Sequence, residues 1–270
     1  LGVVDALGHR SVKAIVGHDF GASVTSCAAL MRPDIFKSMV LMSSPQTGAP
    51  PLRTTKPAVD IHAAMAALPR PRKHYQWYYS TRPANENMWH AKQGVHDFLR
   101  AYYHHKSADW KANKPFPLKS WTADELAKMP TYYIMDLADG MAETVAKEMP
   151  SPAEIAANMW LPEAEMKVYS GEYGRTGFQG GLNWYRVRTS GRFNAELELF
   201  SGRTIDVPST FISGASDWGI HQGPGALERM QKVACTNMKE IHLIPGAGHW
   251  VQQEKPDEVN RLLLEFLRKS

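Results

Sequence analysis

The sequence has little cysteine and no long apolar run. Cys27 and Cys235 are the only cysteines among 270 residues, and neither stands in a Cys-x-x-Cys pair or in the spacing of a zinc site. These absences exclude a disulfide framework and a cysteine-based metal centre, and buried thiols in a reducing compartment are the expected state. No apolar run reaches the ~20 residues that cross a bilayer, so no membrane span is expected.

A secretory signal and a strong charge of one sign are also missing. The first residues, LGVVDALGHR, lack a basic segment followed by an apolar one, and the last three, RKS, are not the peroxisomal SKL. We therefore expect a cytoplasmic protein. The net charge is only +4, and lysine and arginine are scattered along the chain, so no nucleic-acid partner is expected.

Short apolar runs alternate with helix-like segments at both ends of the chain. Four runs predict buried strands: residues 11–16, 38–42, 209–213 and 239–244. Residues 22–31 predict a helix that ends before Pro33, and the apolar stripe after Pro256 predicts a closing helix. This order is typical of an α/β fold with a parallel sheet.

The middle of the chain differs from both ends. Aromatic residues cluster there, helix-like segments such as 122–128 and 152–159 appear, and prolines separate them. We therefore predict a discontinuous sheet core formed by residues 1–46 and 205–270, interrupted by a mostly helical cap at residues 47–204.

The stretch VGHDFGA joins the first predicted strand to the helix after it. Within it, Gly17-x-Asp19-x-Gly21 has the form of a nucleophile elbow, a sharp turn that holds one side chain above the sheet between small neighbours. The nucleophile would then be a carboxylate. The alternative is that Asp19 only caps the helix, a common role for aspartate.

Two later polar residues follow the third and fourth predicted strands. Asp217 stands in GASDWG and His249 in GAGHWV, so nucleophile, acid and histidine occur in the chain order of an α/β-hydrolase triad. Each residue alone could be an ordinary loop residue, but together, at the ends of strands, they predict a catalytic triad. His221 lies in a Gly-rich loop instead of directly after a strand, and it is the weaker candidate for the base.

These motifs resemble the epoxide hydrolase branch of the α/β-hydrolase fold family. VGHDFGA resembles its HDWGA-type elbow, and GASDWG and GAGHWVQQEKPDEVN resemble its acid and histidine loops. GFQGGLNWYR resembles the cap segment that carries one ring-opening tyrosine, which implies that role for Tyr185. Tyr75 in YQWY resembles the second tyrosine, with packing beside Trp77 and Tyr78 as the alternative.

The resemblance implies a reaction as well as a fold. Asp19 would attack the epoxide, and Tyr75 and Tyr185 would protonate the departing oxygen. His249, oriented by Asp217, would activate the water that hydrolyses the ester on Asp19. The product is a vicinal diol, and neither a metal nor an organic cofactor is expected.

Phe20, directly after the nucleophile, has two implications. Its backbone N–H would receive the developing oxyanion. Its side chain offers neither a donor nor a charge. The resemblance to the same superfamily implies a Trp at this position in the haloalkane dehalogenase branch, where its N–H holds the leaving halide, and an Arg in the fluoroacetate branch, where it binds the substrate carboxylate. A haloalkane or haloacid dehalogenase is the alternative function. A serine esterase is weaker still, because Ser23 and Ser26 lie inside the expected helix.

The aromatic residues of the predicted cap bear on the substrate. Trp77 and Trp184 flank the two tyrosines in sequence and indicate a small, apolar or aromatic epoxide, although such residues also serve as ordinary packing. The identity of the epoxide, the stereochemistry of opening and the oligomeric state stay open.

The predicted elbow stands close to Leu1, whereas the resemblance implies a long segment before it. The family's early strands and its His-Gly-x-Pro loop have no counterpart in the sequence. We expect a truncated form of a longer enzyme, which alone turns over an epoxide less well than a form extended upstream. The alternatives are a short chain supported by a partner and a non-catalytic fragment.

Overall fold

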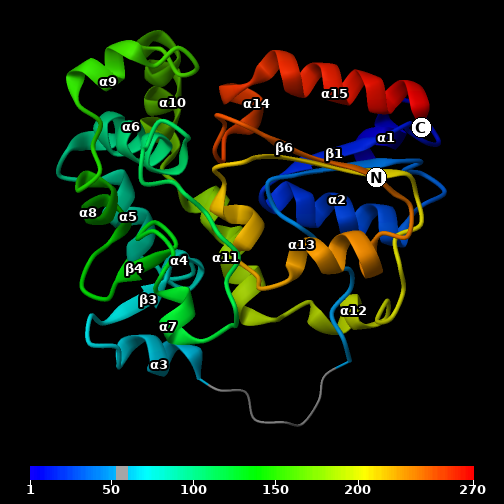
Figure 1. Cartoon of the computed structure of the whole chain (residues 1–270), viewed down its shortest axis with the longest axis horizontal. Coiled ribbons are helices and arrows are strands. Elements are labelled where there is room, and N and C mark those ends of the chain that lie inside the picture. The colour runs from blue at the N-terminus through cyan, green and yellow to red at the C-terminus, as the bar shows by residue number, and fades with distance from the viewer. Residues whose placement is uncertain (53–59) are drawn as a thin grey trace. The chain divides into compact units, whose positions relative to one another are not determined.

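The structure is a computed structural model that describes residues 1–52 and 60–270. By its contacts the chain divides into two compact units, Leu1–Thr55 with Phe193–Ser270, and Lys56–Arg192 (Figure 1). The domain boundaries predicted after residues 46 and 204 both fall within the first unit and stay predictions. Within the part of the chain that the structure describes, no helix is long and apolar enough to span a membrane.

The first unit is built on a parallel sheet of four strands in the order β1-β2-β5-β6. The strands are β1 (Ile15–His18), β2 (Met39–Met42), β5 (Ser209–Gly214) and β6 (Met238–Ile244). Each neighbouring pair runs parallel, so the predicted α/β class is confirmed. Because β2 pairs directly with β5, the sheet joins the two ends of the sequence in one unit.

The first strand begins later than the sequence predicts. The apolar run at 11–16 predicts a strand, but β1 starts at Ile15, and Val12 forms only an isolated bridge to Phe36. The bounds of β1 are set by its pairing with β2, which runs from Ile15 opposite Met39 to His18 opposite Met42. The strand therefore ends directly before the elbow. The next helix, α2 (Phe20–Met31), starts directly after Asp19.

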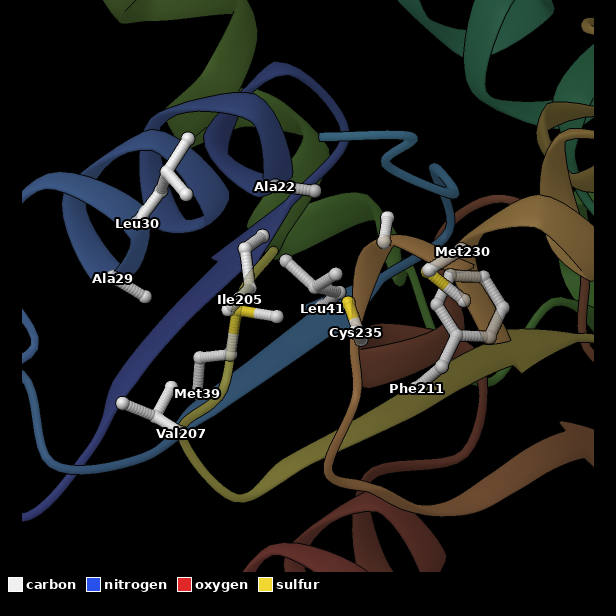
Figure 2. Close-up of a cluster of buried hydrophobic side chains, with 11 residues drawn as sticks. Ala22, Ala29, Leu30, Met39, Leu41, Ile205, Val207, Phe211, Met230 and Cys235 are labelled. Atoms are coloured by element: carbon white, nitrogen blue, oxygen red, sulfur yellow. The ribbon is translucent and has the colours of Figure 1, made fainter. Parts of the chain in front are cut away.

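Helices cover both faces of this sheet, as a parallel sheet requires (Figure 1). Successive strand residues point to opposite faces, so Met39 and Leu41 pack with α2, and Val40 and Met42 pack with α15 (Pro256–Lys269). Figure 2 shows the first of these two cores. The unit's other helices are α1 (Gly2–Ala6), α12 (Asn194–Glu198), η1 (Trp218–His221), α13 (Ala226–Arg229), η2 (Met230–Ala234) and α14 (Val251–Glu254).

The second unit is mostly helical, as the sequence predicts for the middle of the chain. Its antiparallel pair of short strands is β3 (Arg72–His74) and β4 (Ile134–Asp136). Its helices are α3 (Ile61–Ala66), α4 (Tyr75–Tyr79), α5 (Pro83–Trp89), α6 (Gly94–Lys106), α7 (Ala123–Leu126), α8 (Met141–Ala146), α9 (Pro152–Ala157), α10 (Glu163–Thr176) and α11 (Gln179–Ser190). The predicted helices at 122–128 and 152–159 are thus the shorter α7 and α9.

Gly17 is the residue at which the elbow has no room for a side chain. A Cβ on Gly17 would overlap the carbonyl oxygen of Gly21 and Oγ1 of Thr25, whereas a Cβ on Gly21 would meet nothing within 4 Å.

We predict that Gly17→Ala lowers the free energy of unfolding by about 3 kcal/mol or more, measured by urea unfolding. The matched variant Gly21→Ala should change it by less than ~1 kcal/mol, because α2 favours alanine. Equal losses would contradict this account of the turn.

Candidate active site

Asp19 lies at the corner between β1 and α2. Its φ of 55° and ψ of −118° form a conformation that costs a non-glycine residue about 1–3 kcal/mol. The surrounding backbone holds the turn, because the Asp19 N–H donates to the carbonyl of Met42 and the Asp19 carbonyl accepts from Ala22. Although Asp19 occupies the N-cap of α2, its side chain makes no capping hydrogen bond. The geometry therefore favours the elbow over the capping alternative.

His249 lies within reach of both predicted acids. Its Nε2 is 3.6 Å from Oδ1 of Asp19, and its Nδ1 is 3.1 Å from Oδ2 of Asp217. The side chains of His249 and Asp217 are 3% and 1% exposed, whereas that of Asp19 is 26% exposed. The structure thus brings the three predicted residues together, and Asp19 is the most accessible of them.

Asp217 is fixed by the segment that surrounds it. Its Oδ1 accepts from the Gly219 N–H at 2.7 Å, and its Oδ2 accepts from Oγ of Ser213 at 3.4 Å. A carboxylate held in this way favours the tautomer in which His249 carries its proton on Nδ1. Nε2 is the ring nitrogen that faces Asp19. His249, rather than His221, makes the contacts with both acids.

His18, next to Asp19, is a neighbour of the predicted triad that the sequence analysis missed. Its Nε2–H donates to the carbonyl oxygen of His249 at 2.7 Å, and the two rings lie 5.0 Å apart. Burial, followed by the neighbouring His249, lowers the pKa of His18 to about 4. His18 is therefore neutral at pH 7 and acts as a hydrogen-bond donor. The sequence did indicate its position, because His18 directly precedes the predicted elbow and must therefore lie at the end of the first strand.

The two predicted tyrosines lie together within the second unit. Tyr75 begins α4 and is 5% exposed, and Tyr185 lies on α11. Their ring centroids are 5.7 Å apart with the planes at 72°. The ring of Tyr75 also contacts Tyr79 and Tyr133, so it belongs to a tyrosine cluster, and the hydroxyl of Tyr75 accepts from Gln76 Nε2.

The two tryptophans predicted to bind substrate lie on the same helices as these tyrosines. Trp77 on α4 packs its ring against His62 and His74 at 4.0 and 5.1 Å. Trp184 is half-buried and directly precedes Tyr185 on α11. Trp77 thus has a packing role, and substrate contacts of either residue stay predictions.

Hydrogen bonds hold α11 against the end of α4 and against α5. Oγ1 of Thr189 on α11 donates to Oγ of Ser80, directly after α4, at 2.8 Å. Before α11 the chain turns at Gly177, whose φ is 64°, and Oδ1 of Asn85 accepts from the Phe178 N–H. The GFQGG part of the motif therefore fixes where α11, and with it Tyr185, begins.

A buried cation lies among the neighbouring tyrosines. Lys106 is 5% exposed, and its Nζ lies 5.3–5.9 Å from the ring centroids of Tyr102, Tyr132 and Tyr133. Tyr133 in turn packs on Tyr75, with centroids 5.1 Å apart. Tyr133 thus contacts both Lys106 and Tyr75.

Comparisons with known proteins agree with these motifs. A family model described as alpha/beta hydrolase fold matches residues 2–256. Epoxide hydrolase B of Mycobacterium tuberculosis is 28% identical over 274 residues, 99% of this chain and 74% of that protein. Epoxide hydrolase A of the same organism is 43% identical over 122 residues, which are 44% of this chain and 35% of that protein.

The solved structures give the same result. The structure of an epoxide hydrolase from an endophytic Streptomyces matches with a TM-score of 0.72 and 28% identity, over 98% of this chain and 70% of that one. The resemblance to epoxide hydrolases predicted from the motifs is therefore confirmed.

His74 makes the stability of the second unit depend on pH. Its Nδ1 accepts from the Gln76 N–H at the start of α4, and burial, followed by His62 and Arg188, lowers the pKa of His74 to about 3. The unfolded chain protonates this group near pH 6.5. The folded state therefore loses stability as the pH falls from 6.5 to about 3, by roughly 5 kcal/mol at most.

We predict that His74→Asn reduces this loss, because asparagine keeps a capping acceptor that does not titrate. The measurement is the urea midpoint at pH 7 and at pH 4, in which the variant should change less than the wild-type protein. The control is His90→Asn at an exposed site, which should keep the wild-type pH dependence. If His74→Asn also kept the wild-type pH dependence of stability, a group other than His74 would be responsible.

Proposed function

Because the chain belongs to the α/β-hydrolase fold family, we propose that it is an epoxide hydrolase that converts an apolar or aromatic epoxide to a vicinal diol through an ester on Asp19. The observation that carries the proposal is the carboxylate at a strained elbow, 3.6 Å from Nε2 of His249. A carboxylate is a weak nucleophile, but the ring strain of an epoxide makes the attack feasible once the departing oxygen is protonated.

In the first step, an oxygen of Asp19 attacks one ring carbon and the bond from that carbon to the epoxide oxygen breaks. Tyr75 and Tyr185 donate hydrogen bonds to the departing oxygen, and one of them transfers its proton. Phenols suit this role because their usual pKa of about 10 keeps them protonated at pH 7. The proposal is supported by the proximity of the two rings within the second unit.

In the second step, Nε2 of His249 takes a proton from a water molecule that attacks the ester carbonyl carbon. Asp217, 1% exposed, stabilises the imidazolium that forms. The N–H of Phe20 receives the oxyanion, because Phe20 is the first residue of α2 and helix N-termini favour negative charge. Collapse of this intermediate breaks the ester C–O bond, and the departing diol oxygen takes the proton held by His249. The proton of the carboxylic acid formed on Asp19 returns to the tyrosine phenolate, which restores the carboxylate and the phenol.

Two further proposals come from the sequence. Trp77 and Trp184 would contribute apolar surface to the substrate site, and the protein would work in the cytoplasm.

The second candidate function is that of a haloalkane or haloacid dehalogenase. Phe20 speaks against it, because its apolar side chain has no donor for a leaving halide.

We predict that the purified protein converts styrene oxide to phenylethanediol, measured by chromatography, and releases no bromide from 1-bromobutane, measured with a halide electrode. Asp19→Ala should abolish diol formation with the circular dichroism spectrum unchanged. Bromide release at a rate comparable to diol formation would favour the dehalogenase.

The tyrosine roles are tested in the ring-opening step alone. We predict that Tyr185→Phe and Tyr75→Phe each lower the single-turnover rate of ester formation by about 100-fold, the lower end of general-acid effects. Tyr78→Phe in the same YQWY segment is the matched control, and it should change that rate less than about twofold. An unchanged rate in Tyr185→Phe removes Tyr185 from the mechanism.

A further inference from the structure

The loop that carries His249 is held at its backbone by a carboxylate outside the triad. Glu254 on α14 accepts from the N–H groups on either side of the histidine, with Oε2 on Gly248 at 2.9 Å and Oε1 on Trp250 at 3.0 Å. Hydrogen bonds to an ionised carboxylate are about twice as strong as neutral ones. One side chain therefore fixes the peptide groups before and after His249.

A buried serine contacts the same loop. Ser43, directly after β2, is 0% exposed, and its Oγ donates to the carbonyl oxygen of His249 at 3.2 Å. The Ser43 N–H donates to Ile212 of β5, and a Cβ on Gly219 would stand 2.6 Å from the Ser43 carbonyl oxygen. Ser43 therefore touches the histidine loop and the segment after Asp217.

The backbone of Ser43 is strained. Its φ is 64°, a value that glycine adopts readily and that other residues adopt only where their surroundings enforce it. Glycine at this position would relieve the strain but would lose the hydroxyl. Asp19 is the other described non-glycine residue with a positive φ, so the two strained residues follow the neighbouring strands β1 and β2.

We propose that Glu254 and Ser43 are positioning residues for His249, a step that rests on the proposed function because His249 is its general base. The contact of Nδ1 with Asp217 fixes one distance, but it does not stop the ring from moving together with its loop. Glu254 and Ser43, with His18 on the same carbonyl, fix the loop itself. Nε2 thereby stays at the water that attacks the ester.

This role acts on only one of the two chemical steps. Ester formation uses the Asp19 carboxylate and the two phenols, whereas ester hydrolysis needs the imidazole at the attacking water. A displacement of a catalytic group by about 1 Å slows its own step strongly. Loosening the loop should therefore slow hydrolysis and leave ester formation unchanged, so that the ester accumulates.

The test is a rapid-quench single turnover with styrene oxide, in which intact-protein mass spectrometry follows ester formation and decay. Glu254→Gln removes the charge and places an amide against one of the two N–H groups, and we expect ester decay to slow about tenfold. Ser43→Ala removes one hydrogen bond and should slow decay about fivefold. Glu258→Gln on α15, half exposed, is the matched control and should leave both steps unchanged.

Each other outcome has a definite meaning. Unchanged ester decay in both variants, or equal slowing of formation and decay, overturns the positioning role, since a purely structural defect affects both steps. If Ser43→Ala does not fold, Ser43→Gly serves, because it also lacks the hydroxyl but relieves the backbone strain. An absence of ester in the wild-type protein would instead overturn the proposed function, and this inference with it.

Discussion

The close approach of two backbone segments at Gly17 is the constraint on which the rest of the site depends. Without a side chain at Gly17, the carbonyl of Gly21 can lie against β1, and the chain turns sharply enough to hold Asp19 at a φ of 55°. The parallel sheet brings the other two residues of the predicted triad to the same place, because the carboxyl ends of its strands meet at one edge. Asp217 and His249 follow β5 and β6 at that edge.

The proposed chemistry divides between two kinds of surroundings. The buried pair of Asp217 and His249 provides an oriented base, and the more exposed Asp19 provides the nucleophile. The phenols of Tyr75 and Tyr185 belong to a separate aromatic cluster in the second unit. In the proposed mechanism the phenols act in ring opening and the imidazole acts in ester hydrolysis. Removing one of these groups should therefore slow only the step in which it acts.

The sequence predicted the parts of the site that local motifs carry. Asp19, Asp217 and His249 stand in short segments whose order along the chain is informative, and the structure brings them together. The contacts of Ser43 and Glu254 could not be predicted from the sequence. Both side chains contact backbone atoms of the histidine loop, and backbone atoms are the same in every residue, so no motif indicates such a contact. The start of β1 was misplaced for a related reason, since pairing with β2, not composition, decides the register.

The central claim is that Asp19 forms an ester with the substrate, and a single turnover in ¹⁸O-labelled water tests it most directly. With enzyme in excess over styrene oxide, the account predicts a first diol without label, since its new oxygen comes from the Asp19 carboxylate. The label should appear instead in the peptide that contains Asp19, measured by mass spectrometry. Label in the diol of the first turnover would show direct attack by water and contradict the account.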